Sequence, residues 1–211
     1  MGAMDHPRKL NVPGEDLPKV HDQFRETYPW VKKRALIIGG GNSAVEEGLH
    51  LTTFADKVTM LVRGDRLTAS RIAIEKVKEP TSRVEIKYNT VVESLEGQDS
   101  KLKTVKFRDQ ITGEASEIHP AAAFVFIGQT PNAEFLKNYA ELDQYGFVVT
   151  GHDIAHGKEL REAEPLPFET SVPGIFAAGD VRHGSTKQVA SAVGEGAAAS
   201  ISIREFLRRS E

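Results

Sequence analysis

The chain of 211 residues carries a formal net charge of −3 and is 39% hydrophobic, values typical of a folded globular protein with one large or two small domains. This balance provides no basic surface for nucleic acid, and no apolar run approaches the roughly 20 residues that span a membrane. We therefore predict a cytoplasmic protein without nucleic-acid or membrane partners. The chain has no cysteine, which excludes a disulfide, a thiolate metal site or a redox dithiol within these residues, so redox chemistry here requires a bound cofactor.

The first part of the chain predicts a strand–helix–strand unit after a proline-rich lead-in. Residues 34–40 form a short apolar run that ends on glycines, as a buried parallel strand does. A helix is predicted over residues 42–55, and a second strand over residues 57–62. The short turns on both sides of this helix are typical of a βαβ unit, which places the two strands in a parallel sheet.

The middle of the chain completes this domain. A second helix is predicted near residues 68–79, followed by a three-stranded antiparallel meander whose turns lie at residues 97–100 and 112–113. Residues 121–128 are apolar and predict a strand that returns to the parallel sheet, and a long helix is predicted over residues 187–209. The fold class is therefore α/β, with a three-layer Rossmann-like domain of helices, parallel sheet and meander.

A G-x-G-x-x-A motif lies between the first predicted strand and helix. Its first glycine permits a tight turn, its second lets the backbone approach a pyrophosphate, and its alanine permits close packing of helix on strand. The helix start adds free N–H groups and the positive end of the helix dipole. The motif predicts a dinucleotide site; the alternative is a glycine-rich turn that binds nothing. Its residues are Gly39, Gly40, Gly41, Asn42, Ser43 and Ala44.

The residues after the second strand bear on which dinucleotide is bound. A NAD site usually has an acidic residue about 20 positions after the motif, which holds the ribose 2′-hydroxyl. This chain instead has Arg63, with Arg66 and Arg71 following. Because cations suit a 2′-phosphate, NADPH is favoured over NADH. Asp65 is the alternative acidic residue, and solvated surface arginines are the alternative interpretation of the cations.

The motif and other stretches together resemble the low-molecular-weight thioredoxin reductase family of pyridine nucleotide-disulfide oxidoreductases, over nearly the whole chain. The resemblance implies a FAD domain made from two chain segments, with a NADPH domain inserted between them. Residues 1–19 then correspond to the interdomain crossover, residues 20–128 to the NAD(P)H-binding domain, and residues 129–211 to the C-terminal segment of the FAD domain. The matching stretches are IIGGGNSAVEEGLHLTTFADKVTMLVRGDR, FVFIGQTPNAEFL and TSVPGIFAAGD.

The resemblance also implies residues that contact FAD. The family's aspartate after glycine contacts the ribityl chain of the flavin, and the turn into the last helix faces the pyrimidine edge. A helix N-terminus suits that edge, since reduction adds negative charge there. The cofactor-binding residues implied outside the first motif are Gly128, Gly179, Asp180, Lys187, Gln188 and Val189.

The sequence departs from the family pattern in its redox residues and its start. Disulfide reductases of the family carry a CxxC before the NADPH-domain strand; this chain has none, as in relatives of the bacillithiol-disulfide-reductase type. Family members also carry a separate G-x-G-x-x-G for the FAD pyrophosphate, which we expect upstream of residue 1. Of the family's histidine–double-arginine motif, only Arg63 is present.

Two functions therefore remain open. In the first, the chain is the NADPH-binding portion of a FAD-dependent oxidoreductase that passes hydride from NADPH to FAD and on to an unknown acceptor. In the second, it is a non-catalytic NADP(H)-binding module that needs a partner or the missing half. Because this chain carries one half of the flavin site, we expect the apolar stretch IFAAG to contact a partner with the other half, or a second copy of the chain.

Histidines supply the remaining candidates, and we assign neither a catalytic residue nor a metal ligand. His152 and His156 have the spacing of a metal pair, but glycines flank them in a predicted loop. His183 lies beside the implied flavin turn. We favour its interpretation as a histidine of a surface loop over a role in proton transfer.

Overall fold

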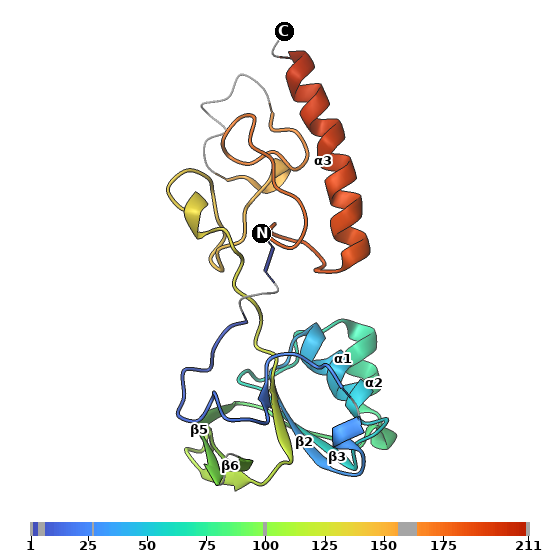
Figure 1. Cartoon of the computed structure of the whole chain (residues 1–211), viewed down its shortest axis with the longest axis vertical. Helices are drawn as coiled ribbons and strands as arrows, with labels where there is room; N and C mark the ends of the chain where they lie inside the picture. The colour runs from blue at the N-terminus through green and yellow to red at the C-terminus, as the bar shows by residue number, and fades with distance from the viewer. Residues whose placement is uncertain (1, 4–6, 27, 99–100, 156–163, 210–211) are drawn as a thin grey trace. The chain divides into compact units, whose positions relative to one another are not determined.

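The structure is a computed structural model that divides the chain into two compact units (Figure 1). The larger unit is Arg8–Gly128, and the smaller joins Met1–Pro7 to Gln129–Glu211. Residues 8–19 thus lie with the larger unit, because apolar side chains such as Leu10 and Leu17 pack against its core. The structure describes all residues except 1, 4–6, 27, 99–100, 156–163 and 210–211.

The larger unit is built on a five-stranded parallel sheet with the order β1-β8-β2-β3-β4. The central strands are buried along most of their length, because both faces of the sheet are covered. Strand β1 has two residues, too few for any hydrophobic pattern to predict it. The strands are β1 (Val20–His21), β2 (Arg34–Ile38), β3 (Lys57–Leu61), β4 (Val84–Lys87) and β8 (Ala122–Val125).

Helices cover one face of this sheet and a meander covers the other, as the sequence predicts. Helices α1 (Asn42–Leu51) and α2 (Arg71–Lys78) contribute Leu51 and Val77 to a core with Phe124 of β8. The second core lies between sheet and meander, and includes Leu36, Leu61 and Phe107. The meander consists of β5 (Thr90–Gln98), β6 (Lys101–Asp109) and β7 (Ala115–Ile118), paired antiparallel. The three-layer α/β fold class is confirmed.

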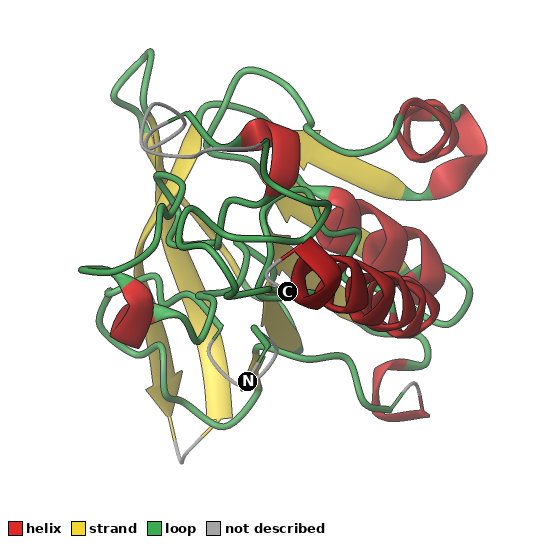
Figure 2. Ribbon diagram, turned by 90° about the horizontal axis from the view of Figure 1, so that it is seen from above, coloured by secondary structure: helices red, strands yellow, loops and turns green. Residues whose placement is uncertain are grey.

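The smaller unit consists mainly of loops and one long helix, α3 (Val189–Arg209) (Figure 1). Figure 2 distinguishes the helices, strands and loops of the chain by colour. Residues 146–150, which read GFVVT, are buried from Phe147 to Thr150 without forming a regular strand. Of α3, Ala199 and Ser202 are buried. The helix therefore has little core beneath it, although no helix in the described part of the chain is both long and apolar enough to cross a membrane.

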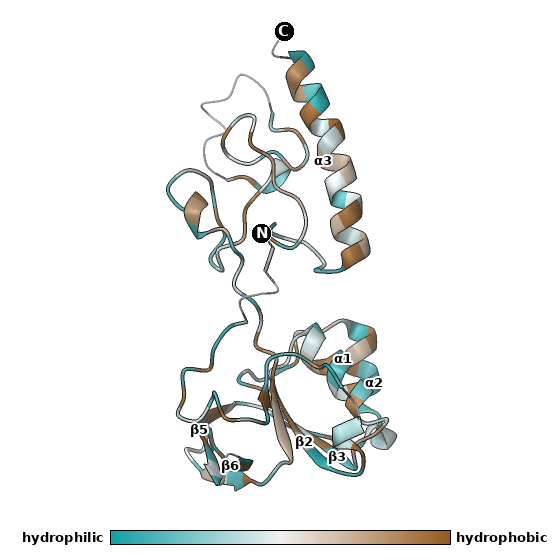
Figure 3. Cartoon of the chain, viewed as in Figure 1, coloured by the Kyte–Doolittle hydropathy of each residue, from teal (hydrophilic) through white to brown (hydrophobic). Residues whose placement is uncertain are grey.

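Hydrophobic residues recur along α3 (Figure 3), and several of their side chains are exposed. Val189 is 84% exposed, far more than Ile175 of the predicted IFAAG surface at 39%. More exposed apolar side chains therefore lie on α3 than on the IFAAG stretch. Those of α3 are Val189, Val193, Ile201, Ile203 and Leu207.

Candidate functional site

The glycine turn follows the carboxyl end of β2, at the centre of the parallel sheet. Gly39 has φ +141°, and a Cβ placed there would lie 2.2 Å from the carbonyl oxygen of Phe126. A Cβ on Gly40 would lie 2.8 Å from the side chain of Val62. Gly39 requires glycine because its φ is positive and the backbone at the end of β8 lies against it. A side chain at Gly40 would force the Val62 side chain to shift.

Gly41 differs from both of these glycines. It has φ −83°, and the nearest atom that an added Cβ would meet is Thr68 Oγ1 at 3.9 Å. The fold therefore does not require glycine at this position. Without a side chain, the backbone at the start of α1 remains open to a group that approaches from outside.

The start of α1 presents unpaired backbone donors. The first bond of the helix runs from Val45 N to Gly41 O, and Gly41 provides no side-chain cap. The N–H groups of Asn42, Ser43 and Ala44 thus have no partner among the described residues. These donors and the positive end of the helix dipole make a site for an anion such as a phosphate.

The loop after β3 is bonded to this turn. Thr68 N donates to Gly40 O at 2.8 Å, and Ser70 N donates to Asn42 Oδ1 at 2.7 Å. Ser70 also caps α2 by accepting from Ala73 N. Asn42 therefore fixes the loop with its side chain, and Thr68 and Ser70 are site residues that sequence patterns miss, because both contacts span 28 residues.

This loop carries the arginines of the predicted site. Arg63 and Arg66 are exposed and form no ion pair within the described residues, and neither does Asp65. The Arg63 carbonyl accepts from Gln110 Nε2 at 2.7 Å, which fixes the backbone at that position. Arg71, on α2, instead lies 2.8 Å from Glu75. Cationic side chains thus follow β3 in a loop that hydrogen bonds from Thr68 and Ser70 hold against the glycine turn.

A second predicted set of residues lies in the smaller unit around Asp180. Its Oδ1 atom is buried and has no hydrogen-bond partner among the described residues. Gly179 has φ +78°, and an added Cβ would meet Ala192 at 3.4 Å, so the turn lies close to α3. A buried carboxylate oxygen without a donor is costly, which is typical of an atom that meets its partner in a ligand.

An ion pair fixes the Asp180 turn to α3. Arg182 donates from Nη2 and Nε to the two carboxylate oxygens of Glu195, at 2.9 and 3.0 Å, and Gly179 N donates to Glu195 at 2.8 Å. The Arg182 and Glu195 side chains are 17% and 12% exposed. Hydrogen bonding from Arg182 lowers the pKa of Glu195, which keeps the pair ionised.

The start of α3 holds the other predicted flavin contacts. Lys187 has φ +57°, and its ammonium lies 4.0 Å from the centre of the Phe147 ring. Burial lowers the pKa of Lys187. Gln188 and Val189 are exposed, and the first bond of the helix runs from Ala192 N to Gln188 O. The N–H groups of residues 189–191 therefore form an open helix end like that of α1.

Gly128 and His183 are the remaining candidates from the sequence, and both form contacts within the protein. Gly128, with φ +105°, is exposed and its carbonyl accepts from Arg8 N at 3.0 Å. His183 Nδ1 lies 2.8 Å from Asp143. Burial opposes ionisation of Asp143, but hydrogen bonds from His183 and two backbone N–H groups outweigh it and lower its pKa.

The two histidines with the spacing of a metal pair fall partly outside the described residues. His152 is exposed, and His156 lies in the part of the chain that is not described. Across the described ranges, the histidines and carboxylates form no group that could hold a metal ion.

The chain belongs to the pyridine nucleotide-disulphide oxidoreductase family, whose sequence pattern matches residues 1–196. Within it the chain is thioredoxin reductase-like. It is 33% identical to thioredoxin reductase of Bacillus subtilis over 175 residues, which are 83% of this chain and 51% of that protein. The crystal structure of Lactococcus lactis thioredoxin reductase aligns with a TM-score of 0.77 at 31% identity, over 99% of this chain and 65% of that one.

Two further relatives agree with this assignment. The crystal structure of T. acidophilum thioredoxin reductase has 28% identity and a TM-score of 0.79, over 100% of this chain and 64% of that one. Thioredoxin reductase of Eremothecium gossypii is 36% identical over 179 residues, which are 85% of this chain and 52% of that protein. The chain thus spans about half the length of the curated relatives it matches.

The glycine turn predicts that two similar substitutions change stability by very different amounts. Gly39→Ala should lower the free energy of unfolding of the larger unit by about 3 kcal/mol or more, because it combines backbone strain with a clash against Phe126. Gly41→Ala should change it by less than about 1 kcal/mol. Urea denaturation followed by fluorescence of Trp30, the single tryptophan, measures both. Equal losses would contradict the assignment of Gly41 as a position the fold leaves free.

The ion pair between Arg182 and Glu195 predicts that a substitution at Glu195 lowers the free energy of unfolding by an amount that depends on pH. Glu195→Gln should lower the free energy of unfolding by about 2–4 kcal/mol at pH 7, because Arg182 loses its charged partner. The pKa of Glu195 lies below its ordinary 4.5, so this contribution is complete above that pH and disappears as the pH falls through the folded-state pKa. Urea denaturation followed by circular dichroism between pH 3 and 7 tests it. The control is Glu205→Gln, because the ion pairs of Glu205 are exposed; it should lower the free energy of unfolding by less than about 0.5 kcal/mol. If the stability difference between Glu195→Gln and the wild type does not change with pH, the account is contradicted.

Proposed function

We propose that the chain is the NADPH-binding portion of a FAD-dependent oxidoreductase of thioredoxin reductase type. Hydride would pass from NADPH to FAD and then to an acceptor, without a dithiol of this chain, which has no cysteine. The observation that carries the proposal is Gly41, a glycine that the fold does not need, at a helix start with open N–H groups. Family membership and the thioredoxin reductase relatives support the same reaction class.

The residues of the larger unit fit a pyrophosphate-bearing nucleotide. The N–H groups of Asn42, Ser43 and Ala44 would donate to its phosphates, with no side chain at Gly41 to obstruct them. Arg63 and Arg66 would hold the 2′-phosphate, because both cations lack a carboxylate partner among the described residues. We expect Arg71 to contribute less to binding of the 2′-phosphate, because it already pairs with Glu75.

The residues of the smaller unit fit the ribityl chain and pyrimidine edge of FAD. A ribityl hydroxyl would donate to the buried, unpartnered Oδ1 of Asp180. The open N–H groups at the start of α3, with Lys187 beside them, would stabilise negative charge on the edge of the ring. The flavin, when bound, supplies the hydride acceptor; this chain's part is to orient it and to compensate its charge.

The exposed apolar face of α3 supports a further protein contact. The chain covers 51% of the Bacillus subtilis relative, so a flavin site of the family type has parts beyond these residues. We propose that a protein segment that carries those parts covers Val189, Val193 and Ile201. A second copy of this chain is the alternative occupant, and sedimentation over a concentration series distinguishes the two.

The second candidate function is a non-catalytic NADP(H)-binding module. It is favoured because the candidate nucleotide contacts and the candidate flavin contacts lie in different units. The open glycine turn belongs to the larger unit, which has two hydrophobic cores of its own. A module of this kind binds the nucleotide through the same residues but transfers no hydride.

Nucleotide titrations test the larger unit's site. The wild-type chain should bind NADPH at least about tenfold more tightly than NADH, because the 2′-phosphate gains a charge-assisted contact. Arg63→Gln should remove most of this difference and change NADH affinity less than about twofold, whereas Gly41→Ala should weaken both. Arg25→Gln, an exposed arginine outside the site, is the control. Tighter binding of NADH than of NADPH would favour Asp65 as the residue that holds the ribose. If neither nucleotide binds, the glycine turn has a structural role only.

A flavin titration tests the smaller unit's site and separates the two functions. Asp180→Ala should weaken FAD binding by about tenfold or more without lowering the free energy of unfolding, because it removes an unsatisfied buried oxygen. The exposed Asp153→Ala is the control. Quenching of flavin fluorescence measures binding. If FAD does not bind the wild-type chain saturably, the non-catalytic module is the better description of this chain.

A further inference from the structure

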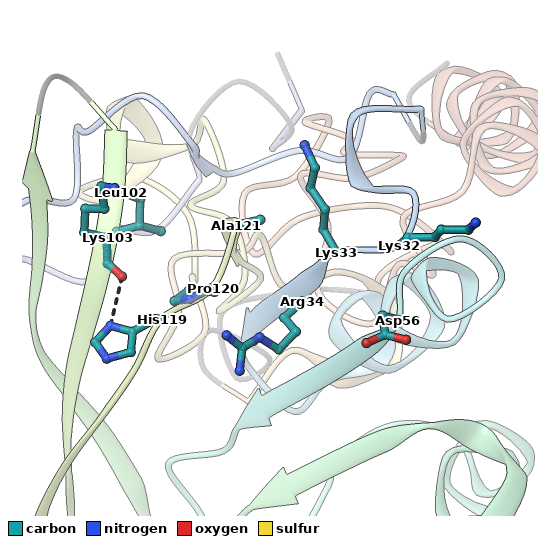
Figure 4. A pocket seen from close by; sticks show the side chains of 9 residues that line it. All are labelled: Lys32, Lys33, Arg34, Asp56, Leu102, Lys103, His119, Pro120 and Ala121. Atoms are coloured by element: carbon teal, nitrogen blue, oxygen red, sulfur yellow. Dashed lines mark hydrogen bonds between the residues drawn. The ribbon is translucent and has the colours of Figure 1, made fainter.

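A hollow of about 420 Å³ opens at the amino end of the parallel sheet (Figure 4). Its walls come from residues just before β2, from the loop before β3, from β6 and from the segment that leads into β8. The glycine turn lies at the other end of β2, about 16 Å away along the strand at roughly 3.3 Å per residue. This hollow is therefore separate from the proposed nucleotide site.

Cationic side chains dominate the lining of this hollow. It contains one carboxylate, that of Asp56, and its cations are Lys32, Lys33, Arg34 and Lys103. None of these cations forms an ion pair with any described residue. The chain as a whole has a net charge of −3, so the local excess of positive charge opposes the overall balance. Uncompensated cations around a concave surface attract anions.

Backbone hydrogen bonds fix the frame that carries these cations. Lys32 N donates to Phe54 O at 3.0 Å, Asp56 N donates to Lys33 O at 2.9 Å, and Ala121 N donates to Arg34 O at 2.8 Å. Arg34 is the first residue of β2, Lys32 and Lys33 lie in the turn before it, and Lys103 lies on β6. The hydrogen bonds fix the backbone that carries the first three of these cations, which lowers the entropic cost of gathering them around a ligand.

The imidazole of His119 completes one wall. Its Nδ1 lies 3.2 Å from the Lys103 carbonyl oxygen and 3.2 Å from Thr104 Oγ1. In Figure 4 the Arg34 side chain extends between Asp56 and the segment of His119 and Pro120. A planar guanidinium thus lines the hollow, where it can bind two oxygens of one phosphate.

We propose that this hollow is a binding site for a small anion with two or more phosphate groups. Arg34 would bind one phosphate bidentately, and Lys33 and Lys103, from opposite walls, would neutralise the next. The volume exceeds that of a single phosphate and lies at the small end of the range for ligand pockets. The site does not depend on NADPH or FAD binding, because it shares no residue with either proposed cofactor site.

Calorimetric titration of the full chain with inorganic pyrophosphate tests the proposal. We expect one saturable site at low ionic strength that weakens as salt is added. The double variant Lys33→Gln/Arg34→Gln should bind at least about tenfold more weakly, and Lys103→Gln, from another strand, several-fold more weakly. The control Lys76→Gln/Lys78→Gln makes the same change of charge on exposed residues of α2 and should stay within about twofold of the wild type.

Three results would overturn the proposal. The first is that the wild-type chain does not bind pyrophosphate saturably. The second is that the two double variants lose equal amounts of pyrophosphate affinity. The third is that excess NADPH displaces pyrophosphate, which would place the probe at the glycine turn. Unchanged urea denaturation of each variant, followed through Trp30, shows that the variants are folded. Failure of nucleotide binding in the titrations of the larger unit would leave this test intact.

Discussion

The steric contact between Gly39 and the carbonyl of Phe126 governs the geometry of the larger unit. Strands β2 and β8 pair in parallel up to Ile38 and Val125, and the chain must turn away at once beyond that pair. Only a residue without a side chain can turn there with φ +141°. Helix α1 then starts at Asn42 and buries Ala44 and Val45 against the sheet, which leaves its first N–H groups open at the sheet's carboxyl edge.

The long helix of the smaller unit is held by charge more than by an apolar core. Helix α3 buries Ala199 and Ser202, so packing alone holds it weakly. The paired Arg182 and Glu195 side chains supply the missing specificity, because Glu195 also accepts from the backbone at Gly179. This arrangement fixes the adjacent Asp180 with an oxygen that lacks a donor. The cost of that oxygen is offset by the contacts that surround it.

The two ends of the parallel sheet favour anions by different physical means. At the carboxyl end, backbone N–H groups and a helix dipole provide fixed partial charges. At the amino end, lysine and arginine side chains provide full charges that are mobile and strongly screened by salt. The backbone site favours a ligand of defined geometry, whereas the side-chain site tolerates variation in the ligand's shape.

Local patterns in the sequence determined the order and type of the main elements and the residues of the glycine turn. An apolar run that ends on glycines, or an alternating meander, is encoded within a few neighbouring positions. Only the tertiary structure decided that residues 8–19 pack into the larger unit, that Thr68 and Ser70 bind the glycine turn, and that Glu195 fixes the Asp180 turn. It also decided which glycine the fold can spare and which cations gather at the amino end of the sheet, because these properties depend on distances between residues far apart in the chain.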